Sequence, residues 1–159
     1  MIHLRKVDAK NIWQVVALEV GESQRDFVAS NTVSILEAYC TITTGGVAMP
    51  YGIYDGEQPI GFLMIGYGDT DWENAPEVAH GNYSLWRFMI DKRYQGRGYG
   101  KAAMDAVLKM LRNNPCGPAK YCWLSYEPEN TVAKKLYRSF GFWENGEMDG
   151  EEIVAVLEL

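Results

Sequence analysis

Hydrophobic and polar positions along the chain follow two different periods, which predicts a mixture of strands and helices. Ile2–Lys6 alternates like a short edge strand, and Asn11–Glu19 carries apolar residues at helical spacing. Two further helical pieces are predicted at Glu22–Ala29 and Asn31–Tyr39. The N-terminal part is therefore expected to be one strand followed by mainly helical segments.

The middle of the chain is dominated by strand patterns. Ala48–Asp55 and Pro59–Tyr67 read as strands, and the Asp-Gly-Glu turn between them predicts a hairpin. Gly68–Glu77 is rich in acidic residues and is expected to be an exposed loop. Asn82–Ile90 is apolar along most of its length, which predicts a central strand of the sheet.

The C-terminal part alternates between helix and strand. Gly98–Arg112 has one apolar helical stripe, Ala119–Ser125 reads as a strand, and Glu129–Phe140 reads as a helix. Phe142–Met148 and Glu151–Leu159 are expected to form a terminal hairpin. Because no repeat or linker interrupts this order, we expect a single α/β domain over residues 1–159.

Composition narrows the class of protein. The chain has 159 residues, 47% of them hydrophobic and 13% aromatic, as expected of a folded globule. No apolar run approaches the roughly 20 residues that span a bilayer, and no leader pattern opens the chain, so a cytoplasmic protein without membrane partners is expected. Cys40, Cys116 and Cys122 lack C-x-x-C spacing, which predicts reduced thiols and no metal site. The net charge of −6 argues against nucleic acid as a partner and is compatible with a cationic substrate.

The most informative motif lies where the Asn82–Ile90 strand pattern gives way to the helical pattern at Gly98. Glycines there alternate as Gly96, Gly98 and Gly100, with Arg97 and Lys101 between and after them. A helix N-terminus offers unpaired amide hydrogens and the positive end of the helix dipole, and glycine lets the backbone approach a ligand closely. The loop is therefore predicted to bind an anion, most plausibly the phosphates of a cofactor, although a purely structural turn is the alternative.

The spacing of this loop separates the possible cofactors. A P-loop requires Ser or Thr after the Gly-Lys pair, and Ala102 stands there instead. A dinucleotide fingerprint requires G-x-G-x-x-G, whereas the chain has the glycines at 96, 98 and 100. The motif that fits is Gln/Arg-x-x-Gly-x-Gly/Ala, read from Gln95 to Gly100.

A second constellation lies on the helix predicted at Glu129–Phe140. Asn130, Ala133 and Tyr137 are spaced i, i+3 and i+7 and therefore share a face. Asn130 also stands where a helix N-cap belongs, and Tyr137 has an alternative role as an amphipathic core residue.

Both motifs resemble one known family. Gln95–Gly100 resembles the pyrophosphate loop of the GNAT superfamily of N-acetyltransferases, and the run Asn-x₂-Ala-x₂-Leu-Tyr-x₂-Phe-Gly-Phe from Asn130 resembles its second signature. Ser23–Asn31, Leu85–Asp91 and Leu124–Pro128 look like the bacterial spermine/spermidine (diamine) N-acetyltransferase branch. The resemblance implies the GNAT acyl-CoA N-acyltransferase fold, a mixed central sheet of about seven strands flanked by helices.

The resemblance implies acetyl-CoA as cosubstrate and assigns residues to it. The backbone of Phe88, Met89 and Ile90 would pair with the pantetheine arm like an added strand, and Asn130 would hydrogen-bond it. The hydroxyl of Tyr137 would act as general acid toward the departing thiolate. The pyrophosphate would lie on the loop made by Gln95, Gly96, Arg97, Gly98, Tyr99, Gly100 and Lys101.

The implied acceptor is a primary amine, with a polyamine such as spermidine or spermine expected from the branch. Candidate substrate-binding residues are Glu22, Asp26, Trp86 and Glu127. The general base stays open, because Ser125 stands where some relatives have a glutamate and cannot itself be a strong base. Water-mediated deprotonation and binding of the neutral amine are both compatible with the chain.

Two other functions remain open at this point. The first is acetylation of a protein N-terminus or lysine, and the second, of a different class, is a non-catalytic acyl-CoA-binding regulatory module. Tyr137 in register with Asn130 favours catalysis. The terminal hairpin makes a homodimer a reasonable expectation.

Overall fold

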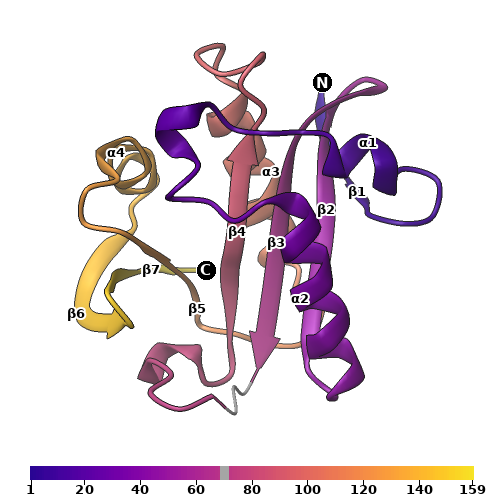
Figure 1. Cartoon of the computed structure of the whole chain (residues 1–159). Coiled ribbons are helices and arrows are strands. Elements are labelled where there is room, and N and C mark those ends of the chain that lie inside the picture. Colours follow the sequence, from indigo (N-terminus) through magenta and orange to yellow (C-terminus); the bar gives the residue numbers. More distant parts are fainter. Residues whose placement is uncertain (69–71) are drawn as a thin grey trace.

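The computed structural model describes residues 1–68 and 72–159, and the strands in these residues form one mixed sheet of seven (Figure 1). The order across the sheet is β1-β2-β3-β4-β5-β7-β6, and only β4 and β5 run parallel. The strands are β1 (Ile2–Lys6), β2 (Val47–Asp55), β3 (Gln58–Gly68), β4 (Asn82–Ile90), β5 (Tyr121–Tyr126), β6 (Trp143–Asp149) and β7 (Glu152–Glu158). The seven-stranded mixed sheet expected from the sequence is confirmed.

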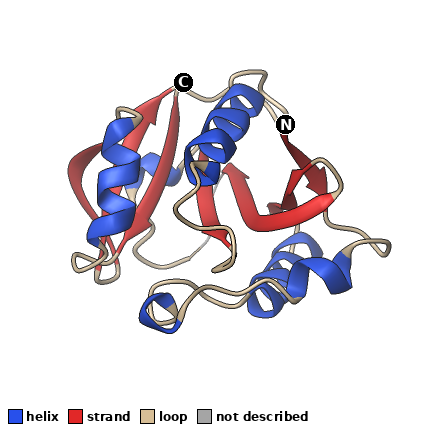
Figure 2. Cartoon of the chain, turned by 90° about the horizontal axis from the view of Figure 1, so that it is seen from above, coloured by secondary structure: helices blue, strands red, loops and turns tan. Residues whose placement is uncertain are grey.

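Helices cover both faces of this sheet. The described helices are α1 (Ile12–Val16), α2 (Asn31–Thr43), α3 (Tyr99–Leu111) and α4 (Thr131–Ser139), with 3₁₀ turns η1 (Glu22–Gln24) and η2 (Glu77–Ala79). Seen from above, α1 and α2 lie on one face and α3 and α4 on the other (Figure 2). Val15 and Ala38 pack with Phe62 and Met64 on the first face, whereas Tyr137 belongs to the larger core on the second.

The apolar stripe of α3 explains how this helix docks on the sheet. Its members recur at helical spacing and are almost completely buried, namely Ala103, Met104, Val107, Leu108 and Leu111. Burying one such large aliphatic side chain contributes about 1.5–3 kcal/mol. The helix predicted at Gly98–Arg112 is thus confirmed within one residue at each end, and its first residue follows the glycine loop directly.

The helix predicted at Glu22–Ala29 is wrong. The segment begins with the 3₁₀ turn η1 and continues as turns and bends toward Ser30. The amides of Gln24, Arg25 and Phe27 each bond a carbonyl three residues back, at 3.0–3.3 Å, so the bonds are of the 3₁₀ type. Residues 21–30 therefore form a strap that crosses one face of the sheet.

Two helix ends also differ from the prediction. α1 stops at Val16 and does not reach Glu19, since the Asn31 side chain takes the carbonyls of Val15 and Leu18 at 2.9 and 3.3 Å. α2 starts where expected, capped by Ser30, but runs to Thr43.

The remaining boundaries lie close to those predicted. The terminal hairpin turns at Gly150, which has a φ of 59°. Of the predicted acidic loop Gly68–Glu77, residues 69–71 lie outside the described residues, Trp72 and Glu73 are exposed, and Glu77 begins η2. No helix in the described ranges is long and apolar enough to cross a membrane.

Candidate active site

The site begins where β4 parts from β5. Their pairing, within the described strands, consists of Tyr83 with Cys122 and Ser84 with Trp123. On its other side β4 has a bulge, because Met64 pairs with Arg87 and Ile65 with Leu85, which leaves Trp86 without a partner position. A bulge bends and twists a strand. From Leu85 onward, β4 therefore has an edge that β5 does not cover.

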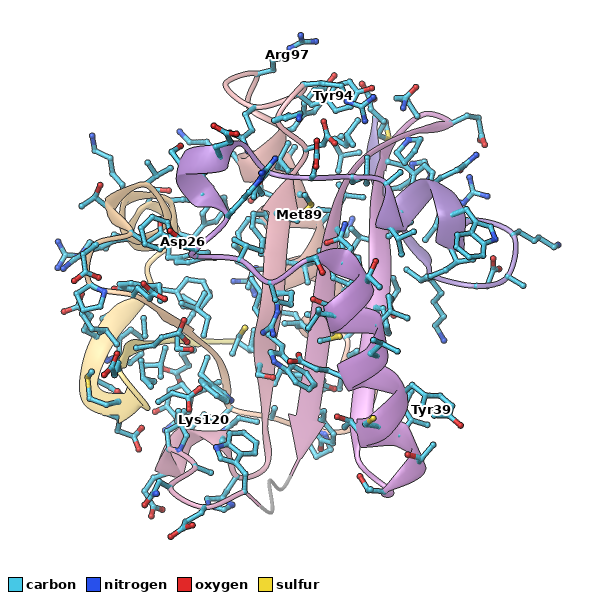
Figure 3. The ribbon with its side chains drawn as sticks, in the orientation of Figure 1. Asp26, Tyr39, Met89, Tyr94, Arg97 and Lys120 are labelled. Carbon is cyan, nitrogen blue, oxygen red and sulfur yellow. The ribbon has the colours of Figure 1, made fainter. Side chains whose placement is uncertain are left out.

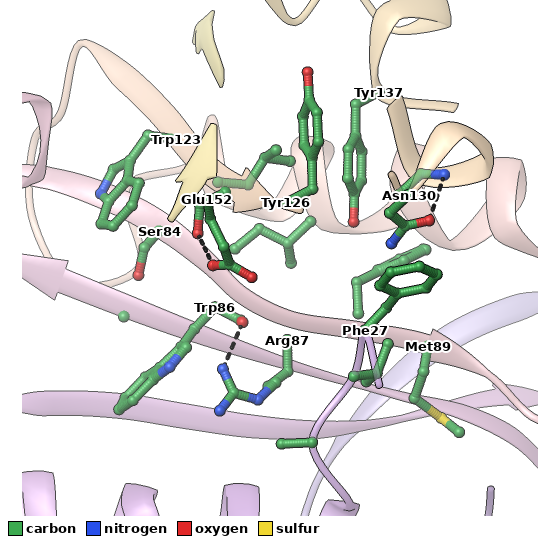
Figure 4. A pocket seen from close by; sticks show the side chains of 18 of the residues that line it. Phe27, Ser84, Trp86, Arg87, Met89, Trp123, Tyr126, Asn130, Tyr137 and Glu152 are labelled. Carbon is green, nitrogen blue, oxygen red and sulfur yellow. Dashed lines mark hydrogen bonds between the residues drawn. The ribbon is translucent and has the colours of Figure 1, made fainter. Parts of the chain in front are cut away.

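A cavity of about 1040 Å³ occupies the space opened in this way. Its walls come from β4, β5, the strap, α4 and the turn between β6 and β7 (Figure 4). This volume is at the upper end of the range of small-molecule sites. The predicted cofactor and acceptor residues can therefore be compared within one continuous space.

The glycine loop at the end of β4 leads into this cavity. Gly96 and Gly98 have φ values of 75° and 82°, a left-handed conformation that side-chain-bearing residues rarely adopt. The first hydrogen bond of α3 runs from the Ala102 amide to the Gly98 carbonyl at 3.2 Å. The amides that precede Ala102 in the helix, those of Tyr99, Gly100 and Lys101, consequently have no acceptor within it. Such a helix start suits a phosphate group.

Side chains of the loop mainly hold its shape. The side-chain Nε2 of Gln95 donates to the Ile90 carbonyl and to Gln24 Oε1, both at 2.8 Å, and so ties the loop to β4 and to the strap. The Tyr99 hydroxyl donates to Asp55 Oδ2 at 3.0 Å. Arg97 extends from the tip of the loop beside the Tyr94 ring, away from the sheet (Figure 3).

The predicted cofactor residues divide into two groups. Seven contribute to the cavity lining together with Asn130: Phe88, Met89, Ile90, Gln95, Gly96, Tyr99 and Gly100. Arg97, Gly98 and Lys101 lie outside the lining, at the loop and the first turn of α3. Met89 and Ile90 have buried side chains, so what they offer a ligand is their backbone on the uncovered edge.

The position of Asn130 is compatible with both roles that the sequence left open, the helix N-cap and a hydrogen-bond donor to the ligand. It is the N-cap of α4, where its Oδ1 accepts from the Ala133 amide at 3.3 Å. Its Nδ2 is turned toward the cavity (Figure 4). Capping fixes the carboxamide and leaves a donor directed at the ligand space.

Tyr137 is the buried aromatic residue of α4 that reaches the cavity. Its side chain is 9% exposed and lies between the rings of Tyr126 and Phe142, each with a centroid distance of 5.9 Å. The hydroxyl points into the cavity (Figure 4). Burial raises the pKa of Tyr137, and the nearby Cys122 and Glu152 raise it further. The phenol therefore stays protonated at neutral pH and can donate a proton.

Three of the four predicted substrate residues line the cavity. Asp26 does so from the strap, Trp86 from the bulge in β4, and Glu127 from the loop before α4. Glu22 is exposed and lies outside the lining.

Sequence reasoning missed two carboxylates. Asp149 and Glu152, on either side of the β6–β7 turn, line the cavity next to Ser125. The Ser125 hydroxyl donates to Glu152 Oε2 at 2.7 Å. Burial raises the pKa of Asp149, and a contact with the Ser125 hydroxyl partly offsets this. No local pattern marks them in the sequence, because it is the strand register that brings them there: Ser125 pairs with Val154, two residues beyond Glu152.

Sequence reasoning also missed Arg87. This side chain lines the cavity from β4 and forms an ion pair with Glu37 of α2 at 2.8 Å. No group of three or more potential ligands for a metal ion occurs in the part of the chain that the structure describes. The charged groups that line the described cavity are therefore carboxylates and two arginines, Arg25 and Arg87, and Tyr137 adds a proton donor.

Comparison with known proteins agrees with this geometry. Residues 12–142 match the family model described as the acetyltransferase (GNAT) family. The chain is 31% identical, over 96% of both chains, to a spermine/spermidine N(1)-acetyltransferase of Bacillus subtilis (strain 168). It is 28% identical to an L-2,4-diaminobutyric acid acetyltransferase of Wolinella succinogenes, covering 84% of this chain and 67% of that one.

Solved structures show the same fold. An aminoglycoside acetyltransferase, AAC(6')-Ib, in complex with coenzyme A superimposes with a TM-score of 0.77 at 18% identity, covering 99% of this chain and 95% of that one. The PaiA N-acetyltransferase of Thermoplasma acidophilum, also in complex with coenzyme A, gives 0.67 at 15% identity, with 100% and 99% covered. The chain therefore belongs to the GNAT family and is an acetyl-CoA-dependent N-acetyltransferase.

Proposed function

We propose that the cosubstrate lies along the uncovered edge of β4, with its pyrophosphate at the N-terminus of α3. The residues present fit the group: the backbone from Phe88 to Ile90 is available for strand-like pairing, and the first amides of α3 have no acceptor within the helix. Asn130 Nδ2 adds a donor from the opposite wall. When bound, acetyl-CoA supplies the acetyl group as a thioester.

Within this arrangement Tyr137 acts as the general acid. Its hydroxyl points into the cavity, and its raised pKa keeps it protonated at neutral pH. A thiolate whose conjugate acid has a pKa near 8.5 leaves more readily when a positioned donor protonates it. The hydrophobic surroundings of Tyr137 hold the ring in place for this transfer.

The acceptor that we propose is a polyamine such as spermidine or spermine. The observation that carries this proposal is the set of carboxylates in the cavity wall, which comes from three separate segments: Asp26, Glu127, Asp149 and Glu152. An amine with several ammonium groups can engage more than one of them, and Trp86 adds an aromatic face for cation–π contact. The similarity to a spermine/spermidine acetyltransferase over nearly the whole chain supports the same class.

Steady-state turnover with acetyl-CoA and a panel of amines tests this proposal. We expect spermidine and spermine to give the highest kcat/KM, a monoamine such as butylamine to be at least tenfold poorer, and added salt to raise the polyamine KM by screening. The panel includes a peptide N-terminus. Turnover of that peptide with none of any polyamine would disprove the proposed acceptor and leave the acetyltransferase activity intact.

A second candidate acceptor is a diamino acid. Arg87 lines the same cavity and offers a guanidinium for a carboxylate, and one relative is named for L-2,4-diaminobutyric acid. Glu37 already pairs with Arg87, which makes this candidate the weaker one. Higher kcat/KM for L-2,4-diaminobutyrate than for the matching diamine would favour it.

A further inference from the structure

Ser125 lies at the centre of an acidic group inside the cavity. Its hydroxyl donates to Glu152 at 2.7 Å and also contacts the Asp149 carboxylate. All three residues line the same cavity as Tyr137. Position 125 of β5 is a serine, which cannot act as a strong base. The adjacent β6–β7 hairpin places two carboxylates, Asp149 and Glu152, beside it.

The register of the sheet fixes this arrangement. Ser125 of β5 pairs with Val154 of β7, so Glu152 lies two residues away on the same face of the sheet. Asp149 pairs with Glu152 across the turn. Figure 4 shows the Glu152 carboxylate directed into the cavity, between the β4 wall at Trp86 and the wall that carries Tyr137.

Two carboxylates outside the lining, Asp91 and Glu37, are already engaged by arginines. Asp91 is 1% exposed and already accepts bonds from the Glu19 amide and from both the amide and the guanidinium of Arg93. Glu37 is held by Arg87. Glu152, by contrast, accepts its hydrogen bond from a neutral group, the Ser125 hydroxyl.

We propose that Glu152 and Asp149, both beside Ser125, bind the reacting ammonium group of the acceptor, and that Glu152 takes the protons which its nitrogen loses. This inference rests on the proposed function, because it assumes that the cavity holds an amine beside a thioester. It assigns the role of proton acceptor to Glu152, because position 125 of β5 is a serine and not a carboxylate.

The proposed step is balanced. Glu152 first takes one proton from the bound ammonium group and passes it to solvent, which leaves a neutral amine. The C–N bond then forms as the C–S bond breaks, Glu152 accepts the second proton from nitrogen, and Tyr137 supplies the proton that sulfur gains. Exchange with solvent then returns Glu152 to the carboxylate and Tyr137 to the phenol. The charge on Glu152 contributes to the raised pKa of Tyr137, which places the two groups within electrostatic reach of each other.

Kinetics of isosteric variants test this assignment. In Glu152→Gln the amide cannot accept the proton, so kcat should fall about 10²- to 10⁴-fold. In Asp149→Asn one charge for the ammonium is lost, so the acceptor KM should rise about tenfold while kcat changes little. Coenzyme A affinity by calorimetry and the Tm should stay unchanged in both. The matched control is Glu151→Gln, an exposed glutamate in the same turn that lies outside the lining.

Ser125 is tested as a positioning residue. Ser125→Ala should lower kcat about tenfold without changing coenzyme A affinity, because Glu152 loses its hydrogen bond. Ser125→Thr keeps a hydroxyl and should restore most of the lost activity. A structural role alone would not depend on the hydroxyl in this way.

The outcomes separate this inference from the proposed acceptor. All variants are assayed with the amine that the wild-type enzyme acetylates fastest, whichever amine that is. If Glu152→Gln and Asp149→Asn match Glu151→Gln in kcat and acceptor KM, the assignment of the carboxylate pair is overturned even when spermidine is the best substrate. If another amine is best and the two variants still show the expected losses, the pair is supported and only the polyamine acceptor fails.

Discussion

Tyr126 and Tyr137 lie with their ring centroids 5.9 Å apart, yet their hydroxyls have different surroundings. Tyr126 donates to Glu144 Oε1 at 2.8 Å, and burial together with this bond raises its pKa to about 12. The hydroxyl of Tyr137 points instead into the cavity (Figure 4). Because the two side chains are both buried, removing each hydroxyl in turn distinguishes an effect on packing from an effect on catalysis.

We expect Tyr137→Phe to lower kcat about 10²- to 10⁴-fold, because the ring is kept and the proton is removed. The acetyl-CoA KM and the Tm should change little. Tyr126→Phe is the control: it should keep kcat and lose about 1 kcal/mol of the free energy of unfolding with its hydrogen bond. Near wild-type kcat in Tyr137→Phe at saturating substrates would mean that another group protonates the sulfur.

The raised pKa of Tyr137 also predicts the alkaline behaviour of the enzyme. A phenol donates a proton only below its pKa, so a raised value moves the loss of kcat to a pH above the ordinary tyrosine value of 10.0. The measurement is kcat at saturating substrates from pH 7 to 11, within the range where the protein stays folded. A decline centred below pH 10 that Tyr137→Phe retains would assign that limb to a different group.

Gly98→Val should weaken coenzyme A binding at least tenfold. An added Cβ meets nothing within 4 Å, so the expected effect in the free protein comes from its φ of 82°, which costs a branched residue on the order of 1–3 kcal/mol. Relaxation of that strain would move the loop and the first amides of α3. Gly146→Val is the control, since Gly146 has a φ of 89° with nothing within 4 Å of an added Cβ, and it lies outside the cavity lining. Equal dissociation constants for the two variants, measured by calorimetry, would contradict a role for the loop conformation.

Asp91→Asn should lower the stability of the folded protein, and Asp91 takes no part in the proposed reaction. Burial by itself would raise the pKa of Asp91, but the hydrogen bonds from Arg93 and from the Glu19 amide outweigh it, so the pKa is lowered. The stabilisation is present above the unfolded pKa of about 3.9 and is lost as the pH falls through the lower folded value.

At pH 7 we expect the free energy of unfolding, measured with urea, to be about 1–3 kcal/mol lower in Asp91→Asn than in the wild type. This difference should decrease toward zero under strongly acidic conditions. The exposed Asp105→Asn serves as the control. A destabilisation that is independent of pH would show that the carboxylate charge contributes nothing.

Most of the sheet and the two long C-terminal helices could be predicted from the sequence because their patterns are local. The stripe of α3 and the Asp-Gly-Glu turn between β2 and β3 need no distant partner to be recognised. The strap over the cavity and the early end of α1 could not be predicted, because their hydrogen bonds join residues far apart in the sequence. Gln24 of the strap bonds Gln95 of the glycine loop, and the Val15 carbonyl bonds Asn31.

The candidate site shows the same division. The glycine loop forms one short motif, and Asn130 and Tyr137 belong to another. Each motif could therefore be recognised in the sequence without knowledge of the fold. Asp149 and Glu152 belong to a turn whose acidic composition is also that of any exposed hairpin. Only the pairing of Ser125 with Val154 places them at the cavity, and register across two strands is not visible in a local pattern.

The short pairing of β4 with β5 has a mechanical consequence. Strands β1–β4 and strands β5–β7 form two half-sheets, and between the described strands β4 and β5 they share the Tyr83–Cys122 and Ser84–Trp123 positions. A cosubstrate bound along the edge of β4, as proposed, would span the two half-sheets where β4 and β5 do not pair. It would then restrict the movement of one half-sheet relative to the other and hold Tyr137 in line with the donor.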